Sequence, residues 1–330
     1  MLLAPGKCGT VLAAALAVLV VAAAAHADIA APTYVKKLVA KGSMPGFVSS
    51  PEGMCIDAAG NLVVADRGNN RIQKFDSSGN LLLNFGAFGT EPGYFQDPGD
   101  VSVDPAGNIY VADETNNRIQ KFDASGNFLL AWGSFGTGPG QFDSMRGLGV
   151  GPDGAVYAAD RGNNRIQKFD GNGNLLRVWG LKGSAPGQLK DPRDIAIDNS
   201  NHVFVLDRDN YRIDEFDSEG TFVNMWGSMG TEPGQFLYPR AITVDNLGHV
   251  YIADGDGVRA SKFDYDGNLL AYWGTRGTGA GQWLEPRGVA ADTQGNVYVA
   301  DKDGDAIYHY RFEVSAASSK SWGGVKELFR

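Results

Sequence analysis

The chain repeats itself every 47 residues over nearly its whole length. Ungapped copies begin at Pro51, Pro98, Met145, Pro192, Pro239 and Pro286. Periods of this length are typical of propellers, solenoids and other arrays in which each copy is one small structural unit. The repeat therefore constrains the fold more strongly than any other feature of the 330-residue sequence.

Each copy contains four short β-like runs separated by turn residues. In the second copy the runs cover residues 101–104, 109–113, 118–123 and 128–133, with Gly- and Asn-rich turns between them. The second run, Ile-Tyr-Val-Ala, is apolar throughout, whereas a strand with one wet face would alternate. Four antiparallel strands in a unit of this size predict a propeller blade. Six copies therefore predict an all-β, six-bladed propeller.

The two ends of the repeat indicate how the ring closes. The sixth copy fades after residue 313, whereas residues 38–51 match residues 273–286 in length, in both central glycines and in the final proline. We therefore expect residues 34–39 to form the outer strand of the last blade. Residues 321–323, Ser-Trp-Gly, also resemble the end of an outer strand and are the alternative.

The repeated residues resemble a known family. The pattern P-R-G-V-A-x-D, then G-N-x-Y-V-A-D, then N-N-R-I-Q-K-F-D looks like the NHL repeat, and the resemblance covers residues 51–313. It implies a six-bladed propeller. Relatives of this kind include RNA-binding, protein-binding, extracellular sensor and lyase proteins, so the resemblance implies a scaffold and no single activity.

The N-terminus predicts export. Lys7 precedes an apolar stretch from Val11 to Ala25, and Ala25-His26-Ala27 fits a small-x-small cleavage site. We expect a signal peptide over residues 1–27, a propeller over 28–314 and a tail outside the repeat over 315–330, in a secreted (periplasmic or extracellular) protein. Cleavage leaves no membrane span and a single cysteine, Cys55, so no internal disulfide can form.

The net charge of the chain limits the classes of partner that we expect. The net charge is −9, whereas nucleic-acid binders usually carry a basic face. We therefore expect no nucleic-acid partner, and we expect a monomer that binds a protein or a small anionic ligand.

Several polar residues recur in nearly every copy, and we interpret them as structural. An Asp at the end of the second run is followed five residues later by an Arg, in register for an ion pair. The sixth copy breaks this pattern with Ala306. The pairs are Asp66–Arg71, Asp113–Arg118, Asp160–Arg165, Asp207–Arg212 and Asp254–Arg259. A second set of aspartates suits turn capping: Asp57, Asp104, Asp198, Asp245 and Asp292. An aromatic residue recurs near the end of the fourth run and predicts packing between blades.

One repeated position varies in charge. It lies where the first run begins, near the channel mouth on the face that carries the loops between blades, which we call the top face. Its members are Glu52, Gly99, Arg146, Arg193, Arg240 and Arg287, and Asp194 follows Arg193 directly. Arginines about 10 Å apart repel by roughly 1–2 kcal/mol, so this group favours either a bound anion or acidic partners. The candidate ligand-binding residues are Arg146, Arg193, Arg240, Arg287, Glu52 and Asp194.

Histidine bears on the enzyme alternative. The resemblance implies that lyase relatives hold a metal largely through histidine, but His202 and His249 fall on bottom turns and His309 on a third run. They cannot converge on the channel, so we expect no zinc site and predict no cofactor. The bottom aspartates have the oxygen atoms that calcium prefers, but they lie on separate turns, so the sequence does not support a calcium site. The favoured function is a binding or scaffold module acting through the top face. A lyase or hydrolase with a metal in the channel is the alternative.

Overall fold

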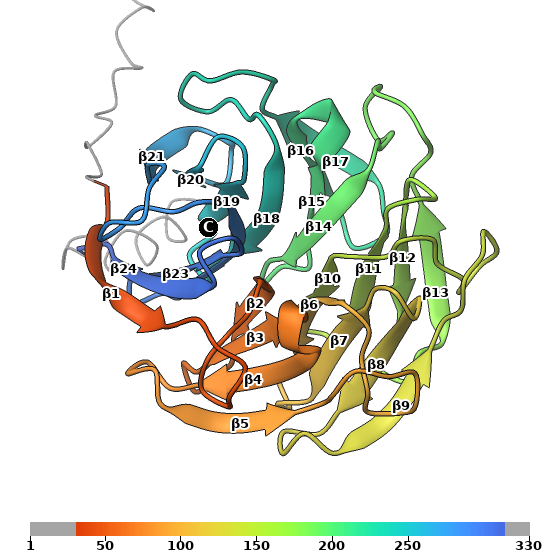
Figure 1. The fold of residues 1–330 in the computed structure, drawn as a ribbon. Coiled ribbons are helices and arrows are strands. Elements are labelled where there is room, and N and C mark those ends of the chain that lie inside the picture. The colour runs from red at the N-terminus through yellow and green to blue at the C-terminus, as the bar shows by residue number, and fades with distance from the viewer. Residues whose placement is uncertain (1–30, 314–330) are drawn as a thin grey trace, which may run out of the picture.

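The structure, a computed structural model, describes residues 31–313. They form six four-stranded antiparallel sheets arranged around a ring (Figure 1). The all-β, six-bladed prediction is confirmed. The predicted signal peptide over residues 1–27 and the predicted tail over 315–330 lie outside the described residues.

Blades one to five each take their strands in chain order from the channel outward. Blades one to three comprise β2 (Pro51–Ile56), β3 (Leu62–Asp66), β4 (Arg71–Phe75) and β5 (Leu81–Phe85); β6 (Pro98–Val103), β7 (Ile109–Asp113), β8 (Arg118–Phe122) and β9 (Phe128–Trp132); and β10 (Leu148–Val150), β11 (Val156–Asp160), β12 (Arg165–Phe169) and β13 (Leu175–Trp179). Blades four and five comprise β14 (Pro192–Ile197), β15 (Val203–Asp207), β16 (Arg212–Phe216) and β17 (Phe222–Trp226); and β18 (Pro239–Val244), β19 (Val250–Asp254), β20 (Arg259–Phe263) and β21 (Leu269–Trp273). Two short 3-10 helices follow second strands, η1 (Arg67–Asn69) and η2 (Arg208–Asn210).

The sixth blade joins the two ends of the described chain. Its strands are β22 (Pro286–Ala291), β23 (Asn296–Asp301), β24 (Ala306–Arg311) and β1 (Thr33–Val39), in the order β1-β24-β23-β22. β1 runs antiparallel to β24, with Thr33 opposite Arg311 and Val39 opposite Ile307. Figure 1 shows the red first strand beside the blue last one. This pairing is the one that the N-terminal match predicts, and the alternative strand at residues 321–323 lies outside the described residues.

The core lies between neighbouring blades. Every residue of β7 is buried, because both faces of a blade are covered by its neighbours. The recurring aromatics pack across these interfaces, as predicted: the ring of Trp132 lies 5.9 Å from that of Phe169 in the next blade. Gly173, with φ of +81°, makes room for that indole, since a Cβ there would lie 2.8 Å from Trp132. Glycine is needed here for both its backbone conformation and its missing side chain.

The bottom aspartates cap turns, as predicted. Asp104 accepts hydrogen bonds from the backbone N–H groups of Ala106 (2.9 Å) and Asn108 (2.8 Å). The same pattern recurs at Asp57, Asp198, Asp245 and Asp292. Within residues 31–313 no helix is long and apolar enough to cross a membrane.

The first strands of the blades surround the channel. They enclose a cavity of about 110 Å³, which Cys55 and Ser102 help to line. Cys55 is half-buried: it lines this cavity and also packs against the core between blades one and two. Burial away from bulk water nevertheless raises the pKa of its thiol.

Candidate functional site: the channel mouth

The repeated Asp–Arg pairs hold the top-face loops in place. Arg118 donates through Nε to Asp113 (2.8 Å) and through Nη2 to the carbonyls of both Glu91 and Tyr94 (3.0 Å each) in the loop between blades. Gln120 donates to the same carboxylate (3.0 Å) and to the same Tyr94 carbonyl (2.7 Å). We call the five Asp–Arg pairs the framework ring, and their structural interpretation is confirmed.

The charge-variable position forms a second ring, here called the inner ring: Glu52, Gly99, Arg146, Arg193, Arg240 and Arg287. Glu52, Arg193, Arg240 and Arg287 are each the second residue of their blade's first strand, and Arg146 comes just before β10. Together they surround a small cavity of about 10 Å³ at the mouth of the channel. All six candidate residues from the sequence, Asp194 included, line this cavity. The structure therefore brings together every predicted member of the site.

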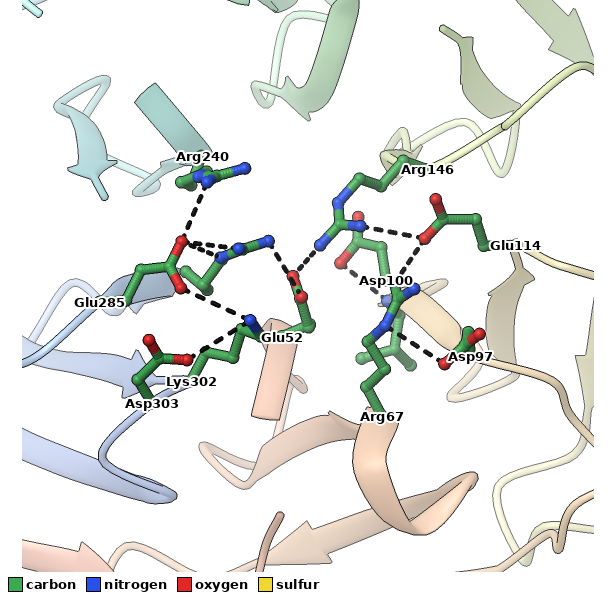
Figure 2. Close-up of polar contacts among 12 residues, drawn as sticks. Glu52, Arg67, Asp97, Asp100, Glu114, Arg146, Arg240, Glu285, Lys302 and Asp303 are labelled. Carbon is green, nitrogen blue, oxygen red and sulfur yellow. Dashed lines mark hydrogen bonds and ion pairs between the residues drawn. The ribbon is translucent and has the colours of Figure 1, made fainter. Parts of the chain in front are cut away.

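Two of the four inner-ring arginines are paired with two carboxylates each. Arg146 contacts Glu52 and lies 3.0 Å from Glu114, so it stands between two acids (Figure 2). Arg287 lies 3.3 Å from Glu52 and 2.6 Å from Glu285. Burial and the neighbouring charges of Arg193 and Arg287 lower the pKa of Arg146. Guanidinium groups remain charged at neutral pH, so these contacts are ion pairs.

Arg240 has one acidic partner and one aromatic partner. Its Nη2 lies 2.9 Å from Oε1 of Glu285 (Figure 2), and its guanidinium carbon lies 3.9 Å from the centre of the Tyr238 ring. Arg208 approaches the same tyrosine at 4.5 Å, so one ring serves two cations. Cation–π contacts of this kind offset part of the cost of desolvating a guanidinium.

Arg193 is the exception. It is 2% exposed, its Nε has no hydrogen-bond partner, and no carboxylate of the described residues forms a salt bridge with it. Burial, followed by the charges of Arg287 and Arg161, lowers the pKa of its guanidinium to about 10. A buried charge without a partner is costly, and proteins keep such groups mostly where a function uses them.

The partners Glu114 and Glu285 were missed by the sequence analysis. Each belongs to another repeat position that varies in charge. We call the six residues that directly follow the second strands the turn ring: Arg67, Glu114, Arg161, Arg208, Gly255 and Lys302. We call the six residues that directly precede the repeat copies the middle ring: Ser50, Asp97, Ser144, Asp191, Tyr238 and Glu285. The charge at both positions changes from copy to copy, and this variation is the sequence signal that identifies the two glutamates.

The three rings divide the top face into two unlike halves. Blades three to five contribute five arginines against the single carboxylate of Asp191. Blades six, one and two contribute three cations against four carboxylates. The first half, here called the basic sector, surrounds Arg193. Within these three rings, positive charge is therefore concentrated in blades three to five of a protein whose net charge is −9.

A pair of aspartates lies just below the inner ring. Asp100 accepts the backbone N–H of Leu148 (2.8 Å), and Asp194 accepts that of Ile242 (2.9 Å), so each ties its blade to the next. Both line the mouth cavity and the larger channel cavity. Burial raises the pKa of each carboxyl, and for Asp100 the charge of Asp194 raises it further. Asp194 thus has a joining role in addition to its position at the mouth.

His202, His249 and His309 lie away from the channel, as expected. His202 contacts Asp198 (3.0 Å) and Tyr265 (2.8 Å) on the bottom face, and His309 contacts Asn296 (3.0 Å). Among the described residues, no three His, Cys, Asp or Glu side chains lie in an arrangement that could hold a metal ion. The residues present at the mouth therefore do not fit a histidine-held metal.

The profile of the NHL repeat matches residues 49–75, 95–122, 142–169 and 189–216. The chain belongs to the NHL-repeat propellers. Related sequences include the protein lin-41 of Caenorhabditis elegans, 42% identical over 55 residues, and the E3 ubiquitin-protein ligase TRIM32 of Homo sapiens, 46% identical over 48 residues. These matches cover 17% and 14% of this NHL propeller, and only 5% and 7% of the two relatives.

Solved structures share the fold of this NHL propeller over most of its length. A streptogramin B lyase matches 85% of it and 98% of its own chain, with a TM-score of 0.60 and 18% identity. A gluconolactonase of Xanthomonas campestris matches 86% and 96%, with a TM-score of 0.60 and 16% identity. At these identities the likeness concerns the fold alone.

Proposed function

We propose that this NHL propeller is a binding module that recognises an anionic ligand at the channel mouth of its top face. One observation carries the proposal: Arg193 is a buried cation at the centre of the basic sector, and no described residue provides it with an acidic partner. A carboxylate or phosphate group would supply the missing partner, because charge-assisted hydrogen bonds to arginine are the strong ones.

The neighbouring side chains suit such a role. Arg146, Arg240 and Arg287 already have acidic partners, so they form a fixed and mostly neutralised frame around Arg193, which forms no salt bridge with any described residue. A ligand therefore meets a single unpaired charge and a shaped mouth. The export predicted from residues 1–27 belongs to the same proposal and places the ligand outside the cytoplasm.

The alternative, a lyase or hydrolase with a channel metal, has less to support it. The fold is shared with a lyase and a gluconolactonase, but the described residues bring no three metal-donor side chains into an arrangement that could hold a metal ion.

Calorimetric titration of the full chain with poly-L-glutamate, citrate and inorganic phosphate tests the proposal. We expect at least one of these anions to bind the wild type at low salt, and we expect the Arg193→Ala/Arg240→Ala double variant to lose that binding. Arg177→Ala is the matched control, because Arg177 lies exposed on the outer strand β13, away from the mouth, and is paired with Glu219. The proposal is wrong if none of the three anions binds, or if the double variant binds them as the wild type does.

A further inference from the structure

The volume of the mouth cavity distinguishes a small anion enclosed in the mouth from a larger ligand that lies on the top face. Sites that enclose a small molecule usually measure about 300–1,000 Å³. The cavity among the inner-ring arginines measures about 10 Å³, room for a single water-sized group. A ligand can therefore place only the tip of an acidic group beside Arg193, and the rest of it must lie on the top face.

Exposed apolar side chains stand at the rim of that face. Phe135 (69% exposed), Leu181 (73%) and Met229 (63%) lie near the beginnings of the loops that enter blades three, four and five. Single exposed apolar residues are ordinary on protein surfaces. Here, however, they recur in neighbouring loops of one face, and Met44 (68%) and Phe88 (69%) extend the series to the loops that enter blades one and two.

The loops that enter blades three, four and five lead to the arginines of the basic sector. The chain passes from Phe135 to Arg146, from Leu181 to Arg193 and from Met229 to Arg240, in each case from the rim to the mouth. The other loops lack this combination of an exposed apolar residue and an inner-ring arginine. Phe88 leads to Gly99, and the exposed Met44 leads to Glu52. The loop that leads to Arg287 carries Arg276 at the repeat position of Phe135 and Met229; in blade four Lys182 holds that position and Leu181 comes directly before it.

We propose that the top face of blades three to five docks a protein partner through an acidic side chain inserted beside Arg193, with apolar side chains of the same segment packed on Phe135, Leu181 and Met229. This rests on the proposed anion site and names its occupant. An unpaired cation selects the acid, and exposed apolar area at the rim supplies the burial that an isolated ion pair lacks. Arg208 and Arg240, stacked on Tyr238, complete a rigid surface between rim and mouth.

Selection from a random dodecapeptide library on the immobilised full chain tests this, since twelve residues extend to about 40 Å. We expect the enriched peptides to combine Asp or Glu with Leu, Phe or Trp. The most enriched peptide, synthesised with a fluorescein label, should lose at least tenfold in affinity when its acid is changed to the amide. The unchanged peptide should also bind at least tenfold more weakly to the Arg193→Met variant and to the double variant Phe135→Ser/Leu181→Ser than to the wild type.

Phe88→Ser is the matched control, because Phe88 is as exposed as Phe135 (69%) but its loop leads to Gly99. We expect it to bind the peptide like the wild type. Thermal unfolding of each rim variant should match the wild type, because all three rim side chains are exposed.

The outcomes distinguish the two proposals. If no peptide is enriched, or poly-L-glutamate binds as tightly as the acidic–apolar peptide, the protein partner is wrong while an Arg193-dependent anion site still stands. If Phe88→Ser weakens binding as much as Phe135→Ser, the basic sector is not the docking surface. If a twelve-nucleotide oligouridylate displaces the peptide and binds more tightly, the partner is a nucleic acid. If no anion of any kind binds, both proposals fall.

Discussion

Two rings of arginine lie on the top face, and they differ in what surrounds each guanidinium. In the framework ring, Arg118 has a carboxylate and two backbone carbonyls as partners, and closely similar contacts recur from blade to blade. In the inner ring the partners come from different repeat positions, and Arg193 has none among the described residues. Both sets would look alike in a count of arginines. The difference teaches that, in a repeat protein, a residue repeated together with its partner serves the fold, whereas one whose partner is missing is available to a ligand.

The largest effect we expect comes from removing an acid of the framework ring. Asp113→Ala leaves Arg118 and Gln120 without their shared acceptor and frees the backbone N–H of Gln96, all at a fully buried site. Breaking a buried pair in this way costs about 3–5 kcal/mol of unfolding free energy. Urea unfolding followed by tryptophan fluorescence measures it. Asp123→Ala, at an outer turn, is the control and should cost much less, and equal losses would contradict the distinction.

The two rings should respond to the same substitution with opposite signs. Arg118→Met removes charge-assisted hydrogen bonds and leaves Asp113 buried without its cation, which costs roughly 2–3 kcal/mol. Arg193→Met replaces an unpaired buried charge with an apolar chain of similar length and should stabilise the fold by about 1 kcal/mol. The measurement is again urea unfolding of both variants beside the wild type. A loss of stability on Arg193→Met would mean that this guanidinium has a structural partner after all.

The sequence predicted the framework ring more completely than the inner one, for a physical reason. Asp113 and Arg118 recur together in one copy, so their pairing could be inferred from register alone. The inner ring was placed correctly at the mouth, because its position in the first strand fixes its distance from the axis. Its pairing could not be inferred, since Glu114 and Glu285 reach across blades from other repeat positions. The unpaired state of Arg193 depends on that geometry and has no signature in the sequence.

Blade four departs from the framework ring and offers a test by pH. Asp214 stands there in the position of Gln120, and Arg212 contacts both Asp214 (2.8 Å) and Asp207 (3.3 Å). Burial, together with the charge of Asp214, raises the pKa of Asp207 to about 7. The folded protein therefore keeps a proton that the unfolded chain releases above about pH 4, so this contribution to stability is lost as the pH rises from about 4 to 7.

Asp214→Gln restores the residue of blades one to three and should flatten that dependence. The variant should gain stability over the wild type at pH 7, and the gain should shrink towards pH 4.5, as measured by thermal unfolding across the range. Asp266→Asn, on an exposed turn of blade five, is the control and should leave the slope unchanged. Parallel curves for the wild type and Asp214→Gln would show that the two carboxyls do not titrate as a pair.

The smallest effect we expect is that of metal removal, and it sharpens the comparison at the inner ring. A mouth built around arginines repels cations, and the described residues bring no three metal-donor side chains together. Dialysis of the full chain against EDTA should therefore leave its Tm unchanged, with elemental analysis of the protein before and after as the companion measurement. A stoichiometric metal whose loss lowers the Tm would reverse the interpretation of the inner ring, because the basic sector would then lie beside a bound cation and the enzyme alternative would gain the donor site it lacks.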